Sequence, residues 1–385
     1  YLKQMNRKCE SALENGAEPV RVLSSVLGQN YPSDELEYSW KKLMQNHPHD
    51  SICCCSVDEV QDEMATRFNK SKQVADYLVS EGKRYIADKI NTKEYEKYKN
   101  ALPFVVFNTT GRKRTSVVSV EIDVTRKSGW LKKCAYDLDE INVPNYKLID
   151  SAGNSIPFKI EDLGVRFGYD LPKDKFRQPY MARRVRVTFE AENISAVGYK
   201  TYALVEGDAE KVTDTLVSGE NCMENDAIRV EINKNGSLNV TDKASGRTYK
   251  GVAYYEETGD LGNEYMYKMP EGSKAITTQD TVAKIELAED EPYRAMYKIT
   301  NTITVPKSGD DNFEDEKRHM VFFKERVGGR SNDTVEMKIE TFVSLDKNGK
   351  GVKIKTRFDN EVKDHRVRIM VPTGINSDVH KADSV

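Results

Sequence analysis

The period of the hydrophobic pattern changes near residue 100, and this change constrains the fold more than any other feature of the sequence. Before it, apolar residues recur every three or four positions, as in Leu36, Trp40 and Leu43. After it, short runs such as 115–122 alternate apolar and polar residues. A period of about 3.6 is typical of an amphipathic helix, and a period of about 2 is typical of a half-buried strand. The sequence therefore predicts an α+β, multidomain chain in which helices precede β-rich parts.

The helical part covers residues 1–99 and predicts a bundle of about three long helices. One apolar stripe runs up to Gly16, where we expect the first helix to end. Pro19 begins a short second helix that ends at Gly28, because proline suits the first turn of a helix and glycine the position after its end.

A short connection, residues 45–56, lies between two predicted long helices. Each of these helices begins with the spacing of a capping box, at residues 34–37 and 56–59. Pro48 ends the first helix, because proline disfavours helical geometry in the residue before it. The connection is therefore held at both ends by helices.

Two β-rich parts follow the bundle. Residues 100–206 predict a small antiparallel β-sandwich without helices. Residues 207–385 predict a large β-sandwich, which we expect to be truncated at its C-terminal end. In the large part, Asn235 and Gly236 stand between two alternating runs and are a strong hairpin signal. Residues 319–327 are expected to form one of several long strands.

The connection between the helices carries His49, Asp50 and three consecutive cysteines, Cys53 to Cys55. A neutral imidazole is the commonest metal ligand, and flanking helices can hold it in place. A catalytic zinc takes about three protein ligands, so partners of His49 must come from elsewhere. Other interpretations stay open. Asp50 or Ser51 could satisfy free N–H groups where the next helix begins, and the cysteines could form a thiolate metal or redox cluster or pack beneath the bundle.

Residues 40–43 and 46–60 together resemble the helix–loop–helix segment of glycoside hydrolase family 38 α-mannosidases, the bacterial ones in particular. The resemblance implies that His49 is a ligand of the catalytic zinc and that Asp50 lines the sugar site. It also implies that the other zinc ligands and both catalytic carboxyl groups belong to an N-terminal α/β barrel, which we do not find in these residues. The sequence departs from the family at Cys54, where bacterial relatives usually have glycine.

Residues 225–230, 259–267 and 364–368 resemble, more loosely, patterns of the C-terminal β-domain of the same family. This resemblance implies that Tyr265 contacts the bound mannose. The alternative is that Tyr265 is an ordinary strand residue, since tyrosine is common in strands. His365 could bind an anionic sugar substituent, or it could belong to a charge cluster where a strand begins.

The resemblance implies a zinc-dependent, retaining α-mannosidase that acts on terminal α-mannosyl linkages of an oligosaccharide or of a mannosyl small molecule. Retention needs a carboxylate and a carboxylic acid about 5 Å apart, and these residues do not supply such a pair. We therefore expect the 385 residues alone to be inactive and to bind zinc weakly. The alternative is a non-catalytic helical and β-sandwich module for carbohydrate binding or assembly.

The composition limits the classes of partner that the chain is expected to bind. Its 59 basic and 62 acidic residues leave a net charge of −3, so no basic surface suited to nucleic acid is implied. No apolar run reaches the length of about 18 residues that a membrane helix needs. The six cysteines are not spaced as a secreted disulfide framework. We expect a cytoplasmic protein, and the sequence leaves a homodimer open.

Overall fold

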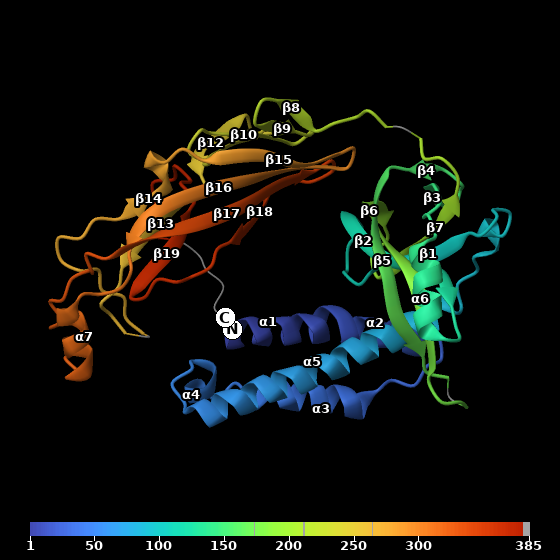
Figure 1. The fold of residues 1–385 in the computed structure, drawn as a ribbon, viewed down its shortest axis with the longest axis horizontal. Coiled ribbons are helices and arrows are strands. Elements are labelled where there is room, and N and C mark those ends of the chain that lie inside the picture. The colour runs from blue at the N-terminus through green and yellow to red at the C-terminus, as the bar shows by residue number, and fades with distance from the viewer. Residues whose placement is uncertain (173, 211, 264, 380–385) are drawn as a thin grey trace.

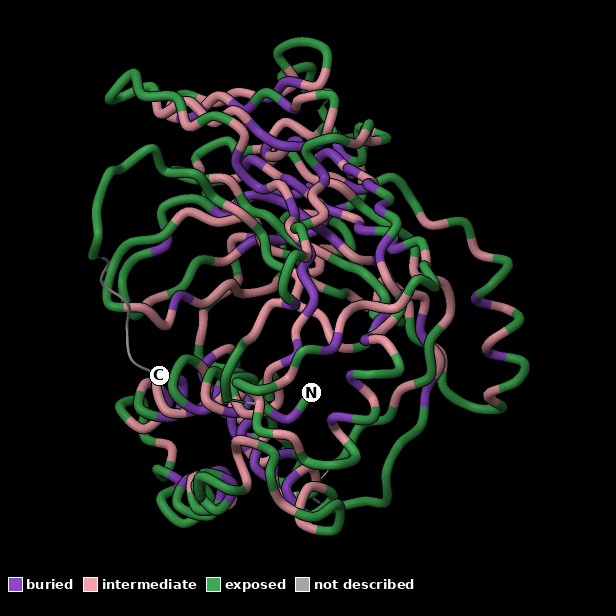
Figure 2. The backbone as a smooth tube through the Cα atoms, turned by 90° about the vertical axis from the view of Figure 1, so that its left-hand side faces the viewer, coloured by how far each residue is buried: buried purple, intermediate pink, exposed green. Residues whose placement is uncertain are grey.

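The computed structural model describes residues 1–172, 174–210, 212–263 and 265–379. A helical bundle is followed by two β-rich parts (Figure 1), which confirms the predicted α+β class. The bundle extends along one side of the molecule, with the turn α4 at the end below the large β part and α2 at the end below the small one. Buried residues gather among the helices and inside the sheets (Figure 2).

The bundle consists of long helices joined by short connections. Its elements are α1 (Leu2–Ala12), a π-helical turn (Leu13–Ala17), α2 (Glu18–Val26), α3 (Ser33–Met44), α4 (His49–Ile52) and α5 (Asp58–Ala87). The first three are continuous, so the predicted break at Gly16 is wrong. Gly16 instead permits close packing, because an added Cβ would lie 3.0 Å from Val79 Cγ2 of α5.

Neither predicted capping box forms. Helix α3 begins after Pro32 and α5 after Val57, and neither start has a side-chain cap. Ser56 precedes the cap position of α5, and its hydroxyl is buried without a partner among the described residues. Both helices instead carry acidic residues in the first turn, Asp34 and Asp58 among them. Their negative charge suits the positive end of the helix dipole.

The small β part contains two antiparallel sheets, with strand orders β1-β7-β3-β4 and β2-β6-β5. The strands are β1 (Leu102–Asn108), β2 (Arg114–Lys127), β3 (Tyr146–Asp150), β4 (Ser155–Ile156), β5 (Phe158–Asp170), β6 (Gln178–Ile194) and β7 (Gly198–Glu206). The expectation of no helix here is wrong. Helix α6 (Leu131–Asp139) buries Cys134 and Leu138 against β6, and this spacing of four residues is itself helical.

The large β part contains antiparallel sheets with strand orders β12-β11-β10-β9-β8, β14-β13-β19 and β15-β16-β17-β18. The strands are β8 (Val217–Gly219), β9 (Cys222–Glu224), β10 (Ile228–Ile232), β11 (Leu238–Asp242), β12 (Arg247–Val252), β13 (Tyr254–Gly259), β14 (Ile276–Thr277), β15 (Lys284–Glu291), β16 (Arg294–Pro306), β17 (Thr334–Asp346), β18 (Lys353–Arg357) and β19 (His365–Met370). Ile232 pairs with Leu238, so the predicted hairpin is confirmed.

The strand expected at residues 319–327 is wrong. Helix α7 (Asp311–Arg318) precedes it, and an irregular segment takes its place. The buried carboxylate of Glu316 accepts hydrogen bonds from the backbone N–H of Val327 at 2.7 Å and of Gly328 at 3.2 Å. A side chain therefore satisfies backbone groups that a neighbouring strand would otherwise pair with.

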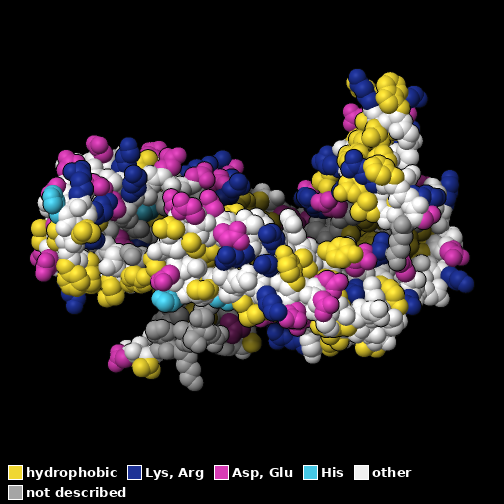
Figure 3. All heavy atoms as spheres, turned by 90° about the horizontal axis from the view of Figure 1, so that it is seen from below, with side chains coloured by type: hydrophobic (Ala, Val, Ile, Leu, Met, Phe, Trp, Pro, Cys, Tyr) yellow, Lys and Arg dark blue, Asp and Glu magenta, His cyan; other side chains and the backbone are white. Residues whose placement is uncertain are grey.

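The surface is mixed in charge. Figure 3 shows acidic and basic side chains interspersed over the face seen from below, as the near balance of charges in the sequence leads one to expect. Within the described ranges, no helix is both long and apolar enough to cross a membrane.

Candidate functional site

The connection between α3 and α5 forms a single helical turn, α4, rather than an open loop. Pro48 is extended, with φ −48° and ψ 137°. Its carbonyl oxygen accepts hydrogen bonds from Ser51 at 2.9 Å and Ile52 at 3.0 Å. The proline therefore both ends the preceding pattern and starts the turn. His49 and Asp50 are the first two residues of that turn.

The imidazole of His49 projects into solvent. Its side chain is 92% exposed, and Nε2 lies 3.2 Å from Asp50 Oδ1. This ring is not packed among aliphatic side chains, so a nitrogen on it remains accessible to a metal ion. A ring buried beneath the bundle would have excluded that role.

The carboxylate of Asp50 faces the cysteines as well as His49. Its Oδ1 lies 3.5 Å from the Cys55 sulfur, and its carbonyl oxygen accepts the Cys55 N–H at 3.2 Å. No side chain caps α4 or α5. The alternative interpretation, in which the Asp50 or Ser51 side chain caps the start of the next helix, is therefore wrong. The Asp50 side chain is 68% exposed, so its oxygens can accept further hydrogen bonds.

Tyr265 reaches the same cluster from the large β part. Its hydroxyl lies 3.8 Å from the Cys53 sulfur and 3.6 Å from the Cys55 sulfur. The residue belongs to the irregular segment after β13, and its N–H donates to Asn263 Oδ1 at 3.0 Å. Tyr265 is therefore not a strand residue. The neighbouring Glu264, part of the pattern that pointed to Tyr265, lies outside the described residues.

Cys53 and Cys55 belong to this cluster, and none of the three consecutive cysteines is packed beneath the bundle. Cys54 and Cys55 are exposed and Cys53 is partly so, so the interpretation in which they pack beneath the bundle is wrong. The Cys53 and Cys55 sulfurs lie 3.2 Å apart. Hydrogen bonds from Cys55 and then Tyr265 lower the pKa of Cys53. The bond to Cys53 raises the pKa of Cys55, and contact with Cys55 and Cys53 raises the pKa of Tyr265.

The described residues contain no complete cluster of metal-ligating side chains. Nowhere within the ranges 1–172, 174–210, 212–263 and 265–379 do three or more His, Cys, Asp or Glu side chains gather in a metal-binding arrangement. The exposed ring of His49 fits a zinc ligand by chemistry and by access. A site centred on it would need its remaining ligands from another part of the protein.

His365 has its imidazole buried beside an acidic side chain, and the residue is not part of an exposed binding surface. Its side chain is 4% exposed, and Nδ1 lies 3.2 Å from Glu257 Oε1. Arg330 also binds the Glu257 carboxylate, with Nη1 at 2.8 Å from Oε2. The chain thus buries a carboxylate between two basic groups. No local sequence signal marks Glu257 or Arg330, because 73 residues separate that pair.

Two family models match the chain. The "Alpha mannosidase middle domain" matches residues 1–86, and the "Glycosyl hydrolases family 38 C-terminal domain 1" matches residues 99–206. The chain belongs to glycoside hydrolase family 38. The helical bundle therefore corresponds to the middle domain of family 38, and the small β part corresponds to its first C-terminal domain.

Relatives of this family 38 chain are longer than it. A putative mannosylglycerate hydrolase of Halalkalibacterium halodurans is 37% identical over 400 residues, which cover 100% of the chain and 43% of that protein. The crystal structure of an alpha-mannosidase from Enterococcus faecalis V583 is 38% identical, with a TM-score of 0.95, and the match covers 100% of the chain and 44% of that structure. A second family 38 structure from Enterococcus faecalis has a TM-score of 0.94 and 37% identity, with 46% of its length covered. The chain therefore spans less than half the length of these relatives.

Proposed function

We propose that this family 38 chain is part of a zinc-dependent, retaining α-mannosidase, to which it supplies one zinc ligand, His49, and two sugar contacts, Asp50 and Tyr265. The observation that carries the proposal is the accessible imidazole of His49 beside Asp50, on a turn that Tyr265 reaches from the large β part. The remaining zinc ligands and both catalytic carboxyl groups would lie in an N-terminal barrel. The relatives have room for such a domain, because the chain covers 43% and 44% of two of them.

The chemistry of the three side chains suits these roles. A neutral imidazole binds zinc through one nitrogen lone pair. When bound, zinc would supply Lewis-acid and templating chemistry at the sugar hydroxyls. The Asp50 carboxylate can accept hydrogen bonds from those hydroxyls, and the Tyr265 hydroxyl can donate to a sugar oxygen. Because sugar hydroxyls both donate and accept, this pair of side chains suits an α-mannosyl group on an oligosaccharide or on a small molecule.

The test is His49→Ala in the full-length protein, with zinc measured after removal of free metal and with hydrolysis of an aryl α-mannoside followed. We expect loss of both bound zinc and turnover. His47→Ala is the matched control, because its Nε2 lies 2.8 Å from Asn6 Oδ1 within the bundle, and we expect that variant to keep both. Retained zinc with a near-normal rate in His49→Ala would refute the assignment.

The alternative function is a non-catalytic module that binds carbohydrate or supports assembly. The two proposals differ in the domain that they require before these residues in the full-length protein. The enzyme proposal requires a barrel upstream, with a His-x-Asp pair among its zinc ligands. It also predicts that the 385 residues alone turn over no aryl mannoside and bind zinc weakly. Robust turnover by the chain alone would mean that the catalytic carboxyl groups lie within it.

A further inference from the structure

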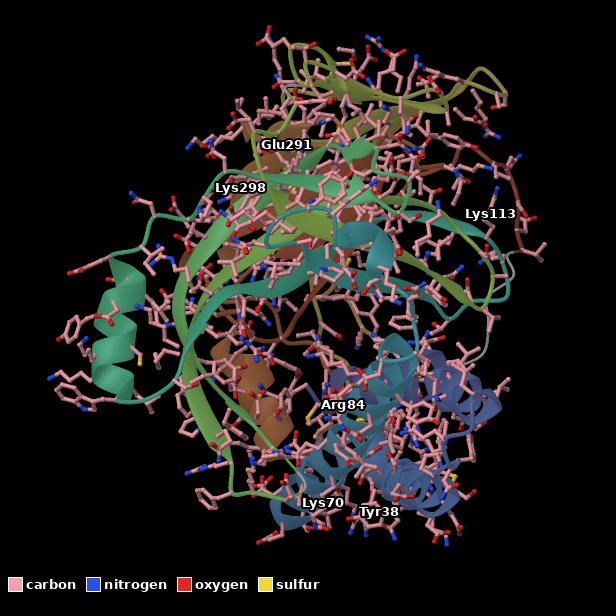
Figure 4. All side chains as sticks on the ribbon, turned by 90° about the vertical axis from the view of Figure 1, so that its right-hand side faces the viewer. Tyr38, Lys70, Arg84, Lys113, Glu291 and Lys298 are labelled. Carbon is pink, nitrogen blue, oxygen red and sulfur yellow. The ribbon has the colours of Figure 1, made fainter. Side chains whose placement is uncertain are left out.

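A cavity of about 330 Å³ lies where the small and large β parts meet. Asp150, Glu190 and Tyr202 line it from the small part, and Tyr293 and Lys347 line it from the large part. The two parts also approach one another nearby, where Lys159 Nζ lies 4.0 Å from Glu291 Oε1. Figure 4 labels Glu291 on the large part. None of the cavity residues belongs to α4 or to the Tyr265 segment, so this cavity is separate from the candidate zinc site.

Tyr293 is a buried polar group without a partner. The residue is 2% exposed, and its hydroxyl has no hydrogen-bond partner among the described residues. Leaving a buried hydroxyl unpaired destabilises the folded protein. Burial raises the pKa of this hydroxyl, so it stays protonated and can donate. An acceptor placed in the cavity would satisfy it.

Glu190 gives the cavity a buried acceptor. The residue is 7% exposed, and its carboxylate accepts hydrogen bonds from the Asn348 backbone at 3.4 Å and from the Asn348 amide at 2.7 Å. Each carboxylate oxygen has a second lone pair that can accept another hydrogen bond. Burial raises the pKa of this carboxyl. Glu192 also lines the cavity, and the third lining carboxylate, Asp150, is already used by its own turn, where it accepts from Ala152 at 3.0 Å and Asn154 at 2.8 Å.

The cavity also has apolar walls. Tyr202 is 3% exposed, and the cavity is also lined by Pro157 of the small part and Pro292 of the large part. Burial raises the pKa of Tyr202 to about 12, so its hydroxyl is a donor at neutral pH. A small ligand that fits needs hydroxyl groups that both donate and accept, together with a C–H face for the apolar walls. The volume is near the lower end of the range of about 300–1,000 Å³ that small-molecule pockets occupy.

We propose that this cavity is a second carbohydrate site, which takes one neutral monosaccharide unit between the two β parts. In it, a sugar hydroxyl donates to Glu190 while sugar oxygens accept from Tyr293 and Tyr202. A ligand in this position contacts both parts at once and therefore stabilises their mutual arrangement. The proposal is independent of the zinc site, since it uses no residue of that site.

The test is calorimetric titration of the 385-residue chain with D-mannose and with methyl α-D-mannoside. We expect one saturable site. Tyr293→Phe should weaken binding roughly five- to tenfold, because one hydrogen bond to the ligand is lost. The same variant without sugar should unfold at the same or a higher temperature than the parent, because it removes an unpaired buried hydroxyl. Tyr199→Phe, at a residue that is 46% exposed and outside the cavity, is the matched control and should bind normally.

Glu190→Gln provides a second variant, which should also weaken binding. The proposal is overturned if neither sugar binds saturably, or if both cavity variants bind as the parent does. It is also overturned if His49→Ala abolishes the binding, because the sugar would then occupy the candidate zinc site. Saturable binding of ethanolamine in place of the sugars would overturn it as well, since the cavity would then be a site for a cation.

Discussion

The hydroxyl of Tyr265 lies 3.6 Å from the sulfur of Cys55, although 210 residues separate them in the sequence. This contact joins the large β part to the connection between α3 and α5. Cys55 in turn lies 3.5 Å from Asp50 Oδ1, and Asp50 lies 3.2 Å from His49 Nε2. The three residues that the family resemblance singles out are thus linked through a thiol whose role the resemblance does not specify.

The reactivity of Cys53 tests this arrangement. Because hydrogen bonds with Cys55 and then Tyr265 favour its thiolate form, the pKa of Cys53 is lowered. Iodoacetamide reacts with the thiolate, so alkylation of Cys53 in the folded chain should rise at lower pH than in the urea-unfolded chain. Cys55→Ala should move the folded profile to higher pH. Peptide mass spectrometry measures both profiles, and identical profiles for folded and unfolded protein would contradict the described contacts.

His49→Ala should leave the stability of the isolated chain almost unchanged. The His49 side chain is 92% exposed, and within the described residues its polar contact is with Asp50. Exposed substitutions away from special features change the free energy of unfolding by no more than about 0.5 kcal/mol. Urea unfolding of the chain measures this change. A loss of several kcal/mol would mean that the ring supports the turn, as a structural residue would.

Local signals account for what the sequence predicted well. The proline at position 48 and the Asn235–Gly236 pair act on the backbone within a few residues, and both predictions agree with the structure. Other features depend on partners far along the chain. Glu316, which replaces an expected strand partner, bonds to N–H groups 11 and 12 residues away. Glu257 meets His365 across 108 residues. A pattern read over a short window contains no information about such pairings.

The buried carboxylate of Glu257 supports the large β part. Its side chain is 0% exposed and bonds to Arg330 and His365. Glu257→Ala would leave two basic groups without their acceptor, and breaking a buried ion pair in this way costs about 3–5 kcal/mol. Urea unfolding should show that loss. Glu286→Gln is the control, because Glu286 and its partner Lys284 are 44% and 70% exposed, and an exposed pair contributes about 0–1 kcal/mol.

The pH dependence of this contribution has a definite sign. Burial raises the pKa of Glu257, but hydrogen bonds and charge from His365 and Arg330 outweigh it, so the pKa falls below its ordinary value of 4.5. A lowered pKa in the folded state means that the contribution is present above pH 4.5 and is lost as the pH falls through the folded value. The stability difference between the parent and Glu257→Gln should therefore shrink in acid. A difference that grows in acid would contradict the assignment.

Gly82 permits the close packing of α5 on α2. A Cβ at this position would lie 2.7 Å from Val20 Cγ1 and 3.1 Å from Arg21 Cδ. Overpacking costs about 1–3 kcal/mol, whereas alanine gains about 1 kcal/mol over glycine in a helix. We expect Gly82→Ala to destabilise the chain by about 1 kcal/mol in urea unfolding. Ser80→Ala, at an exposed position of the same helix, is the control and should cause no loss. A stabilised Gly82→Ala variant would mean that the two helices can separate at little cost.

Cys54 has a backbone φ of +67°, in the left-handed region that favours glycine. The family resemblance implies glycine at this position, and the backbone has a conformation that glycine adopts readily. A non-glycine residue pays about 1–2 kcal/mol there, and glycine loses about 0.5–1 kcal/mol more backbone entropy on folding. Cys54→Gly should therefore stabilise the chain by up to about 1 kcal/mol. Cys54→Ala is the matched control, because it removes the thiol but keeps the Cβ, and it should give no gain. Urea unfolding separates the two variants, and an equal gain in both would assign the effect to the thiol rather than to the backbone.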